Sequence, residues 1–448
     1  MRKRGLAMGL TALMTAGLLT GCVSGQTQTT ETTKVPEQKE TTAKDTEANT
    51  KGAEKTSSES SSEDVVTLEL FWQKSNTNVI QEIIDKFEAE NPNIKIELTA
   101  TSSDTGKQIF QTRMATNEPM DLVQHWPSQA EFRAMCKEGR MVDLSDYAWN
   151  DNIIDTYYDM STVDGKLYSV PLSINAGVVA YNKEIFEANN LEVPKTWAEL
   201  VNAADTLKAA GVTPFIFSNG DKENCSQKFH IMTAAVADDK WNPYDFYVGM
   251  YEGSGAKFAD NEYSKKAAER LYLLSSEYAQ PDPMSTNYDL AMQMFANGEG
   301  AMMIAGTWAQ SDIEKNNPEI QMGMFAMPAD DGVNMLISGI DPGIAAMTGT
   351  GKEEYAAKFL EFVTRTENAQ IYTDYDKSPS PIKGVKTDNP TIDLMLSYIE
   401  EGKAIPWWRD YISTGVVSDE ADLAQAFLMD GDLDTFLTGE EEIVLRKE

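Results

Sequence analysis

Residues 66–71 read Val-Thr-Leu-Glu-Leu-Phe, a run of β-branched and apolar residues that is typical of a buried strand. Apolar residues then recur at helical spacing over residues 79–87, and residues 94–98 alternate as a second strand. Residues 108–116 are compatible with another helix, and residues 121–125 with a third strand. The order strand, helix, strand, helix, strand predicts an α/β fold with a mostly parallel sheet.

Aromatic and polar residues follow the ends of these predicted strands. Trp72, Gln73 and Lys74 follow the first strand, and His125 and Trp126 lie at the end of the third. Because ligands of open α/β sheets lie beyond the carboxyl ends of the strands, we expect ligand contacts here from Trp72 or Gln73 and from His125 or Trp126. The alternative is that a tryptophan only packs and that His125 only satisfies a backbone group.

The first 22 residues have the pattern of a secretory signal. Three basic residues precede an uncharged run over residues 5–19, which is too short to span a bilayer. The run ends in Leu19-Thr20-Gly21-Cys22, which resembles the lipobox of bacterial lipoproteins. The resemblance implies that Cys22 is lipidated and holds the chain at the outer face of a cell membrane. An ordinary signal peptide with a chance cysteine is the alternative.

Residues 23–64 contain no isoleucine, leucine, methionine or aromatic residue, and they consist largely of Thr, Ser, Glu, Lys and Gln. Such a segment cannot bury enough apolar surface to offset its ordering entropy. The composition predicts a disordered tether. The remaining residues, 65–448, are too many for one average core and suggest two lobes.

The composition excludes several classes of partner and site. The formal net charge is −33, which argues against nucleic acid and anionic lipid surfaces as partners, although a local basic pocket could still take an anion. His125 and His230 are the only histidines, and no Cys-x-x-Cys spacing occurs. We therefore expect no metal and no cofactor. We expect Cys136 and Cys225 to be buried thiols rather than a disulfide.

Several later segments carry a family resemblance. Residues 165–171 read Gly-Lys-Leu-Tyr-Ser-Val-Pro, residues 178–186 read Val-Val-Ala-Tyr-Asn-Lys-Glu-Ile-Phe, and residues 194–200 read Pro-Lys-Thr-Trp-Ala-Glu-Leu. Residues 295–303 read Phe-Ala-Asn-Gly-Glu-Gly-Ala-Met-Met, with Gly-Thr-Trp at 306–308. In this order and spacing they resemble the bacterial extracellular solute-binding proteins, family 1, which are the maltodextrin-binding-protein-like sugar receptors of ABC importers.

The resemblance implies a two-lobe periplasmic-binding-protein-like fold of class II. Each lobe would be a mostly parallel sheet flanked by helices, with the ligand cleft between the lobes. By analogy, lobe one comprises residues 65–176 plus 338–388, and lobe two comprises residues 177–337 plus 389–448. Within lobe two we expect Thr196 to cap a helix and residues 212–217 to form a strand.

The resemblance also nominates ligand contacts. Trp308 matches the aromatic residue after the second signature, and Trp407 or Trp408 matches an aromatic residue that follows a proline near the end. Asn175 and Asp341 match the two crossing segments. Indole rings suit the C–H faces of a sugar, whereas amides and carboxylates suit its hydroxyls. Trp407 and Trp408 are adjacent, so we expect one to bind and the other to pack. Asp341 could instead cap a turn.

The implied function is that of a monomeric receptor that captures a neutral mono- or oligosaccharide by lobe closure and delivers it to a membrane permease. A polyol, a peptide or a sugar phosphate is an alternative ligand, the last because Arg409 lies beside Trp408. A surface glycoside hydrolase would need two facing carboxylates, which 71 acidic residues do not exclude. No Gly-x-Ser-x-Gly or Walker motif occurs. We expect no enzyme activity. A surface adhesin is a third reading.

Overall fold

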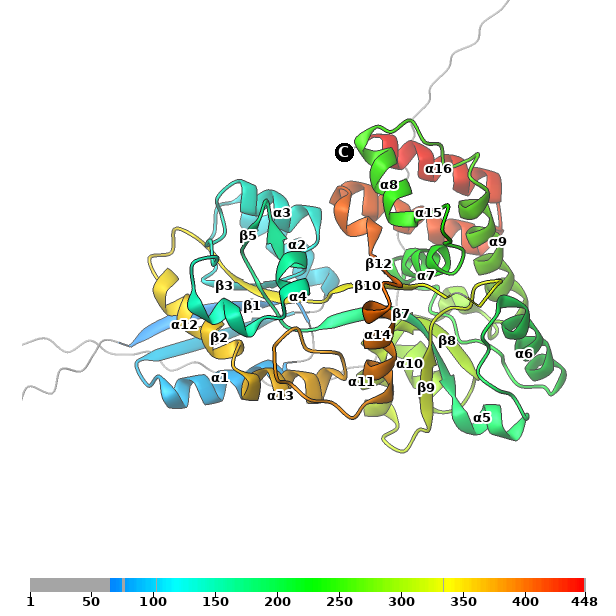
Figure 1. Cartoon of the computed structure of the whole chain (residues 1–448), viewed down its shortest axis with the longest axis horizontal. Helices are drawn as coiled ribbons and strands as arrows, with labels where there is room; N and C mark the ends of the chain where they lie inside the picture. Colours follow the sequence, from blue (N-terminus) through cyan, green and yellow to red (C-terminus); the bar gives the residue numbers. More distant parts are fainter. Residues whose placement is uncertain (1–64, 75–76, 102, 333, 447–448) are drawn as a thin grey trace, which may run out of the picture. The chain divides into compact units, whose positions relative to one another are not determined.

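The structure is a computed structural model, and it describes residues 65–74, 77–101, 103–332 and 334–446 (Figure 1). The predicted signal, Cys22 and the predicted tether up to residue 64 lie outside the described residues. The described chain forms two five-stranded sheets and a small two-stranded one. We call the parts of the chain around the two larger sheets lobe one and lobe two.

The sheet of lobe one has the strand order β2-β1-β3-β11-β6. Strand β1 pairs in parallel with β2 and β3, whereas β11 is antiparallel to both β3 and β6. The first three strands are therefore joined as the sequence predicts, through helices. The bounds are β1 Val66–Trp72, β2 Ile94–Ala100, β3 Leu122–His125, β6 Val170–Pro171 and β11 Gly343–Ala346.

The sheet of lobe two has the order β12-β10-β7-β8, and β9 also pairs with β7. Strands β10 and β12 are parallel, but β7 is antiparallel to β10, β8 and β9. The bounds are β7 Ile174–Asn182, β8 Met302–Gly306, β9 Met322–Phe325, β10 Leu336–Ile340 and β12 Ala404–Pro406.

The prediction of an α/β fold is confirmed, but the prediction of a mostly parallel sheet in each lobe is wrong. In lobe one the pairings divide equally between parallel and antiparallel, and in lobe two most are antiparallel. The reason is that β7 enters lobe two as a crossing strand and runs against its neighbours, and β11 does the same on its return to lobe one. The sequence pattern on which the prediction rests covers residues 66–125, which form only the parallel strands of the lobe-one sheet.

Two chain crossings lie side by side between the sheets. Strand β6 continues into β7, and β10 continues into β11. Ile174 is opposite Ile340 in the antiparallel β7–β10 pair, and the N–H of Leu172 donates to the carbonyl of Pro342 at 2.9 Å. In Figure 1, β7 and β10 pass between the two groups of strands. The predicted boundaries of the lobes remain a prediction.

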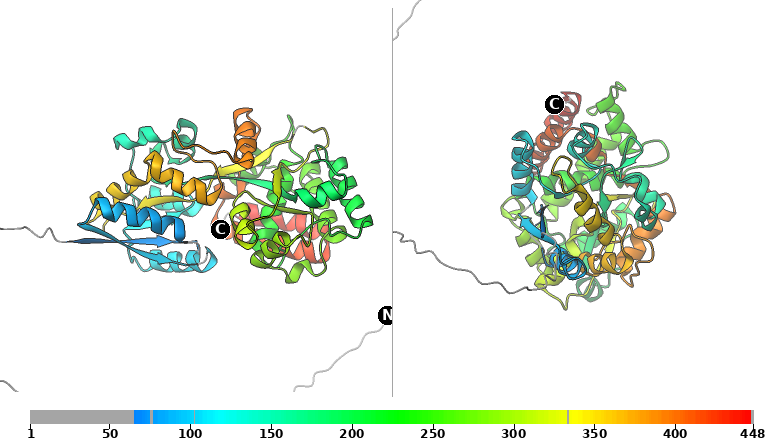
Figure 2. Two further views of the ribbon diagram at one scale, coloured as in Figure 1. Left: turned by 90° about the horizontal axis from the view of Figure 1, so that it is seen from below. Right: turned by 90° about the vertical axis from the view of Figure 1, so that its left-hand side faces the viewer.

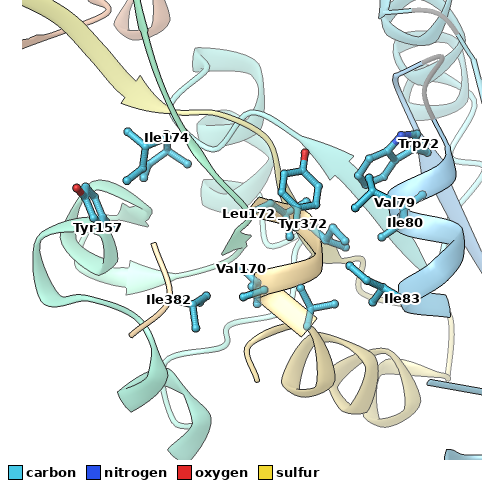
Figure 3. Close-up of a cluster of buried hydrophobic side chains, with 14 of the residues drawn as sticks. Trp72, Val79, Ile80, Ile83, Tyr157, Val170, Leu172, Ile174, Tyr372 and Ile382 are labelled. Carbon is cyan, nitrogen blue, oxygen red and sulfur yellow. The ribbon is translucent and has the colours of Figure 1, made fainter. Parts of the chain in front are cut away.

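Helix α1 (Asn78–Glu90) shows why the apolar spacing matters. Its buried residues are those that the spacing predicts: Val79, Ile80, Ile83, Ile84 and Phe87. They pack against α12 (Glu353–Val363) and α13 (Thr366–Asp376), which come from far along the chain and lie beside α1 in Figure 2. Figure 3 shows Trp72 next to Val79 and Ile80, with Tyr372 of α13 nearby. Burial of this apolar set therefore joins the two halves of lobe one.

Two local predictions have different outcomes. The Oγ1 of Thr196 accepts a hydrogen bond from the N–H of Glu199 at 3.3 Å, so the predicted helix cap is confirmed. Glu199 in turn accepts from the N–H of Lys195 at 2.8 Å, one residue earlier than a standard capping box. The predicted strand at residues 212–217 is wrong, because only Phe215 forms bridges, to Ala279 and Met302. Pro214 has no N–H to donate and interrupts the ladder.

The remaining elements cover the sheets or link them. Cys136 and Cys225 are both free and buried, which confirms the expectation of thiols. Within the described ranges, no helix combines the length and apolar character that crossing a membrane requires. The other bounds are α2 Ser103–Ala115, α3 Ala130–Lys137, η1 Ala148–Asn152, α4 Asp155–Met160, β4 Thr162–Val163, β5 Lys166–Leu167, α5 Lys183–Ala188, α6 Trp197–Ala209, α7 Lys222–Ala234, α8 Pro243–Glu252, α9 Glu262–Glu277, η2 Pro283–Ser285, α10 Tyr288–Ala296, α11 Ala309–Asn316, α14 Pro390–Glu400, η3 Trp408–Tyr411, α15 Thr414–Asp430 and α16 Leu433–Arg446.

Candidate functional site

The predicted contacts are on strand ends and crossing segments of both lobes. Trp126 follows β3, Trp308 follows β8 and Trp407 follows β12. Asn175 is on β7, and Asp341 stands between β10 and β11. Trp126 and Trp308 are half-buried, and the other three are largely buried. We call these five residues the candidate site.

Trp126 and Asp341 form the lobe-one side of the candidate site, and Lys74 lies beside Asp341. The indole Nε1 of Trp126 donates to Asp341 Oδ1 at 3.0 Å. Asp341 Oδ2 lies 3.5 Å from the Nζ of Lys74, just beyond β1. Burial lowers the pKa of Lys74, but the negative charges of Asp341 and Asp376 outweigh that effect and hold the pKa above its usual value. Lys74 is therefore an ammonium, and Asp341 is held from two sides.

Trp308, Trp407 and Asn175 form the lobe-two side. The Nε1 of Trp407 donates to Asn175 Oδ1 at 2.7 Å, which ties the end of β12 to the crossing strand β7. The rings of Trp308 and Trp407 are 6.2 Å apart between centroids at an angle of 46°. The ring of Trp308 lies so close to the Cα of Gly306 that a Cβ there would be 2.0 Å from it. A glycine in β8 is thus required for the observed position of Trp308.

Trp72 and Gln73 are buried residues rather than exposed contacts. Both have no exposed surface. The side-chain amide of Gln73 donates to the carbonyl of Gln124 at 2.6 Å, and its own N–H donates to Gln124 Oε1 at 2.8 Å. These bonds join the ends of β1 and β3. Gln73 therefore holds the strand ends that carry Lys74 and Trp126, and Trp72 packs below them against α1.

His125 is also a supporting residue. It is 2% exposed and packs on Phe132, with ring centroids 5.4 Å apart. Burial lowers its pKa to about 4, so the ring is neutral near pH 7. Its Nδ1 accepts a hydrogen bond from the backbone N–H of Trp126 at 2.8 Å. The histidine therefore satisfies a backbone group, which is the alternative that the sequence left open. The hydrogen bond fixes the direction of the backbone at Trp126.

Trp408 is in the core of lobe two and outside the candidate site. Its side chain has no exposed surface, and it stacks on Tyr247 at 3.8 Å and 13°. The ring of His230 meets the ring of Trp408 edge-on, with centroids 4.2 Å apart. Of the adjacent pair, Trp408 packs and Trp407 lies beside Trp308. Adjacent side chains near a short 3-10 turn cannot point the same way, so one of them had to enter the core.

Contacts also join the two lobes beside the candidate site. Ser128 Oγ, before α3, donates to Asp410 Oδ2 of η3 at 2.8 Å. Burial raises the pKa of Asp410, although the neighbouring Arg409 charge and the Ser128 hydroxyl act against that rise. The guanidinium of Arg409 is 3.7 Å from Asp410 and 3.6 Å from Glu223. Its charge is therefore matched by carboxylates of the protein, which weakens the case for a phosphate ligand.

Sequence reasoning missed two participants in this region. Lys74 was recognised as following β1, but nothing in the sequence pairs it with Asp341, 267 positions later. Asp312 of α11, whose Oδ2 accepts from the hydroxyl of Tyr288 at 2.9 Å, carries no sequence signal. Their roles depend on long-range contacts. The one sequence signal for either residue is the position of Lys74 at a strand end, where ligands of α/β sheets bind.

Two surface pockets lie away from the candidate site. One, of about 280 Å³, is lined by the end of α13 and residues 386–392; the other, of about 510 Å³, is formed around Glu69, Asp121 and Lys352. Within the described ranges no group of three or more His, Cys, Asp or Glu side chains could hold a metal ion. The candidate site itself offers flat indole faces together with carboxylate and amide oxygens, which suit contacts with a small molecule that has both apolar and polar surface.

Comparisons with known proteins place the chain in a family. A family model described as bacterial extracellular solute-binding protein matches residues 73–370. The multiple sugar-binding protein of Streptococcus mutans is 30% identical over 75% of this chain and 79% of its own length. An ABC transporter extracellular-binding protein of Pyrococcus horikoshii is 26% identical over 77% of this chain and 78% of its own.

The fold is shared with solved two-domain binding proteins. The structure of the binding protein RafE in complex with raffinose superimposes with a TM-score of 0.76 at 26% identity. That match covers 86% of this chain and all of the other. The predicted two-lobe fold is therefore confirmed. With the family model extending over well over half of its residues, the chain belongs to the bacterial extracellular solute-binding proteins.

Proposed function

We propose that this protein is the extracellular receptor of an ABC importer and that it captures a neutral mono- or oligosaccharide between its two lobes. The observation that carries the proposal is the grouping of Trp126, Trp308 and Trp407 with Asp341 and Asn175. Two rings are half-buried, so their faces can be completed by a ligand. The names of the relatives, which include a sugar-binding protein and a raffinose complex, support the same class.

The chemistry of the site fits a sugar better than the alternatives. Indole faces complement the C–H arrays of a pyranose, and the indole N–H, amide and carboxylate groups complement its hydroxyls. Arg409, the residue that kept a phosphate ligand open, lies between Asp410 and Glu223, so its charge is already matched within the protein. Polyols and peptides remain the competing ligands. We propose binding without turnover, in keeping with the description of the family as solute-binding proteins.

Anchoring belongs to the same proposal. The lipobox-like tetrapeptide ending at Cys22 predicts a lipid anchor, and residues 23–64 would be the tether between the membrane and the receptor. A chain held by two or more acyl groups stays at the membrane much more firmly than one held by a single group. The receptor would act as a monomer at the extracytoplasmic face and pass its ligand to a permease. Metabolic labelling with a fatty acid, lost in C22A, tests the anchor.

Calorimetry tests the carbohydrate assignment. The purified protein is first screened by thermal shift against neutral sugars, polyols, peptides and sugar phosphates, because a ligand that binds the native state raises the unfolding temperature. We expect a saturable response to one sugar series and a loss of affinity of at least tenfold in W308A. The matched control is W197A, which removes another half-buried indole of lobe two that lies against Arg270. A response only to phosphates or peptides would contradict the assignment.

A further inference from the structure

Lys74 stands between carboxylates at the lobe-one side of the candidate site. Its Nζ is 3.5 Å from Asp341 Oδ2, and the two side chains are 23% and 7% exposed. The negative charge of Asp376, at the end of α13, acts on the same ammonium. Asp376 is 8% exposed, and its Oδ2 makes no hydrogen bond within the described residues. The positive charge of Lys74 thus compensates the negative charge of two carboxyl groups that have little solvent exposure.

A third carboxyl group approaches from lobe two. Asp312 belongs to α11, which follows β8 and contacts α13 of lobe one. Burial raises the pKa of Asp312, while hydrogen bonding from Tyr288 and the positive charges of Lys315 and Lys74 act to lower it. Helix α11 contacts α13, which carries Asp376, so carboxyl groups of both lobes lie on contacting helices. Without the ammonium of Lys74, this region would hold uncompensated negative charge at low solvent exposure.

We propose that Lys74 is a positioning residue for ligand capture: its ammonium holds the carboxylate of Asp341 in place beside the Trp126 indole, so that ligand affinity depends on its positive charge. The inference rests on the proposed function, because it concerns the same site. Lys74 acts through Asp341, whose two oxygens are held by the Trp126 indole and by the ammonium. With the ammonium removed, Asp341 keeps only the indole contact and faces the charge of Asp376.

The pH dependence of binding separates this role from a merely structural one. In a K74M variant the carboxyl groups repel each other when ionised, and protonation at lower pH relieves the repulsion. The penalty should therefore be largest at high pH and shrink as the pH falls. The polar and titratable groups that act on Lys74 or its carboxylate partners are Trp126, Ser173, Tyr288, Asp289, Asp312, Lys315, Asp341, Tyr372, Tyr375, Asp376 and Ser378.

The experiment measures the dissociation constant of the full-length chain for the sugar found by screening, between pH 5.5 and 8.5. We expect K74M to bind at least tenfold more weakly at pH 8 and to lose most of that difference at pH 5.5. K74R, which keeps the charge, should remain within threefold of the wild type throughout. The matched control is K86M on α1, which removes an exposed lysine paired only with Glu82 at 3.9 Å and should leave binding unchanged.

A charge-balanced double variant guards against a variant that fails to fold. K74M/D376N removes the ammonium together with one carboxylate, so it should bind within fivefold of the wild type with a flat pH profile. A K74M variant that binds like the wild type, a loss that is equal at all pH values, or a folded double variant that is more than tenfold weaker would overturn the inference. A wild-type chain that binds no sugar would instead refute the proposed function.

Discussion

A single methyl group placed at Gly306 should displace the ring of Trp308. Gly306 is in β8, and the Cβ of an alanine there would lie 2.0 to 2.2 Å from three atoms of the indole. Carbon atoms in contact are normally about 3.5–4.0 Å apart, so the ring must move by roughly 1.5 Å or tilt. The φ angle of Gly306 is not positive, so an alanine there adopts the backbone conformation without strain. The G306A variant therefore changes the position of a proposed ligand contact without removing it.

The size of the effect follows from what a buried tryptophan contributes. Loss of a central tryptophan from a desolvated binding site commonly costs about 2 kcal/mol or more. This corresponds to affinity that is roughly 30-fold weaker if the displaced ring loses its whole contribution. Overpacking of the core should also lower the free energy of unfolding by about 1–3 kcal/mol. Folded G306A should thus bind weakly, and it should unfold at a lower temperature than the wild type.

Calorimetry and thermal unfolding measure the two effects separately. G249A is the matched control, because a Cβ at Gly249 of α8 would be 3.6 Å from its nearest neighbour, an ordinary contact. It should leave affinity unchanged and stabilise the helix by about 0.5–1 kcal/mol. If G306A is as destabilised as expected but binds the sugar as tightly as the wild type, the ring of Trp308 does not touch the ligand, and its assignment to the site is refuted.

Three further predictions concern the lobe contact, a buried amine and the thiols. S128A removes the hydrogen-bond donor to Asp410 and should weaken ligand binding about tenfold, as measured by calorimetry. The reason is that hydrogen bonds to charged groups contribute about 1.5–3 kcal/mol. Unchanged affinity would mean that this contact does not support the bound state. Burial lowers the pKa of Lys228 to about 8 from 10.5, so the unfolded state binds more protons between these pH values and the free energy of unfolding should rise with pH. The rise should be on the order of 3 kcal/mol, and denaturant titration should find it missing in K228M. Burial raises the pKa of Cys136 to about 12 and of Cys225 to about 11, so a thiol reagent at pH 8 should modify both far more slowly in the native protein than after denaturation.

The parallel half of lobe one could be predicted from sequence, because each of its elements has a complete local signal. Residues 66–125 show strand and helix periodicities that agree with the burial of β1, α1, β2 and β3. The antiparallel strands have no such signal. Strand β7 is buried along nearly its whole length, so its apolar sequence does not indicate whether it pairs in parallel or antiparallel. Its partners come from residues 302–340, far along the chain. Only the family resemblance indicated that the chain crosses between lobes.

The candidate site was predictable in position but not in role. Strand ends indicated residues 72–74 and 125–126, and the structure divides them by burial: Trp126 and Lys74 are partly exposed, whereas Trp72, Gln73 and His125 are buried and the last two bond to the strand ends. A sequence cannot separate these roles, because alternate residues beyond a strand end point to opposite sides and the register of the turn decides which side is the core.

The supporting residues have a consequence for how the site should respond to mutation. Trp126 is fixed by a hydrogen bond from its N–H to His125 and by its own bond to Asp341, and Trp407 is fixed by Asn175. The rings of Trp126 and Trp407 are therefore each held by a polar partner from another segment of the chain, and both partners, Asp341 and Asn175, lie on the crossing segments. A rotation of one lobe against the other must move Asn175 and Asp341, and with them the rings that they hold. We therefore expect ligand contact and lobe movement to be coupled through these hydrogen bonds: variants of Asn175 and Asp341 should change affinity and the extent of closure together, whereas W308A should change affinity alone.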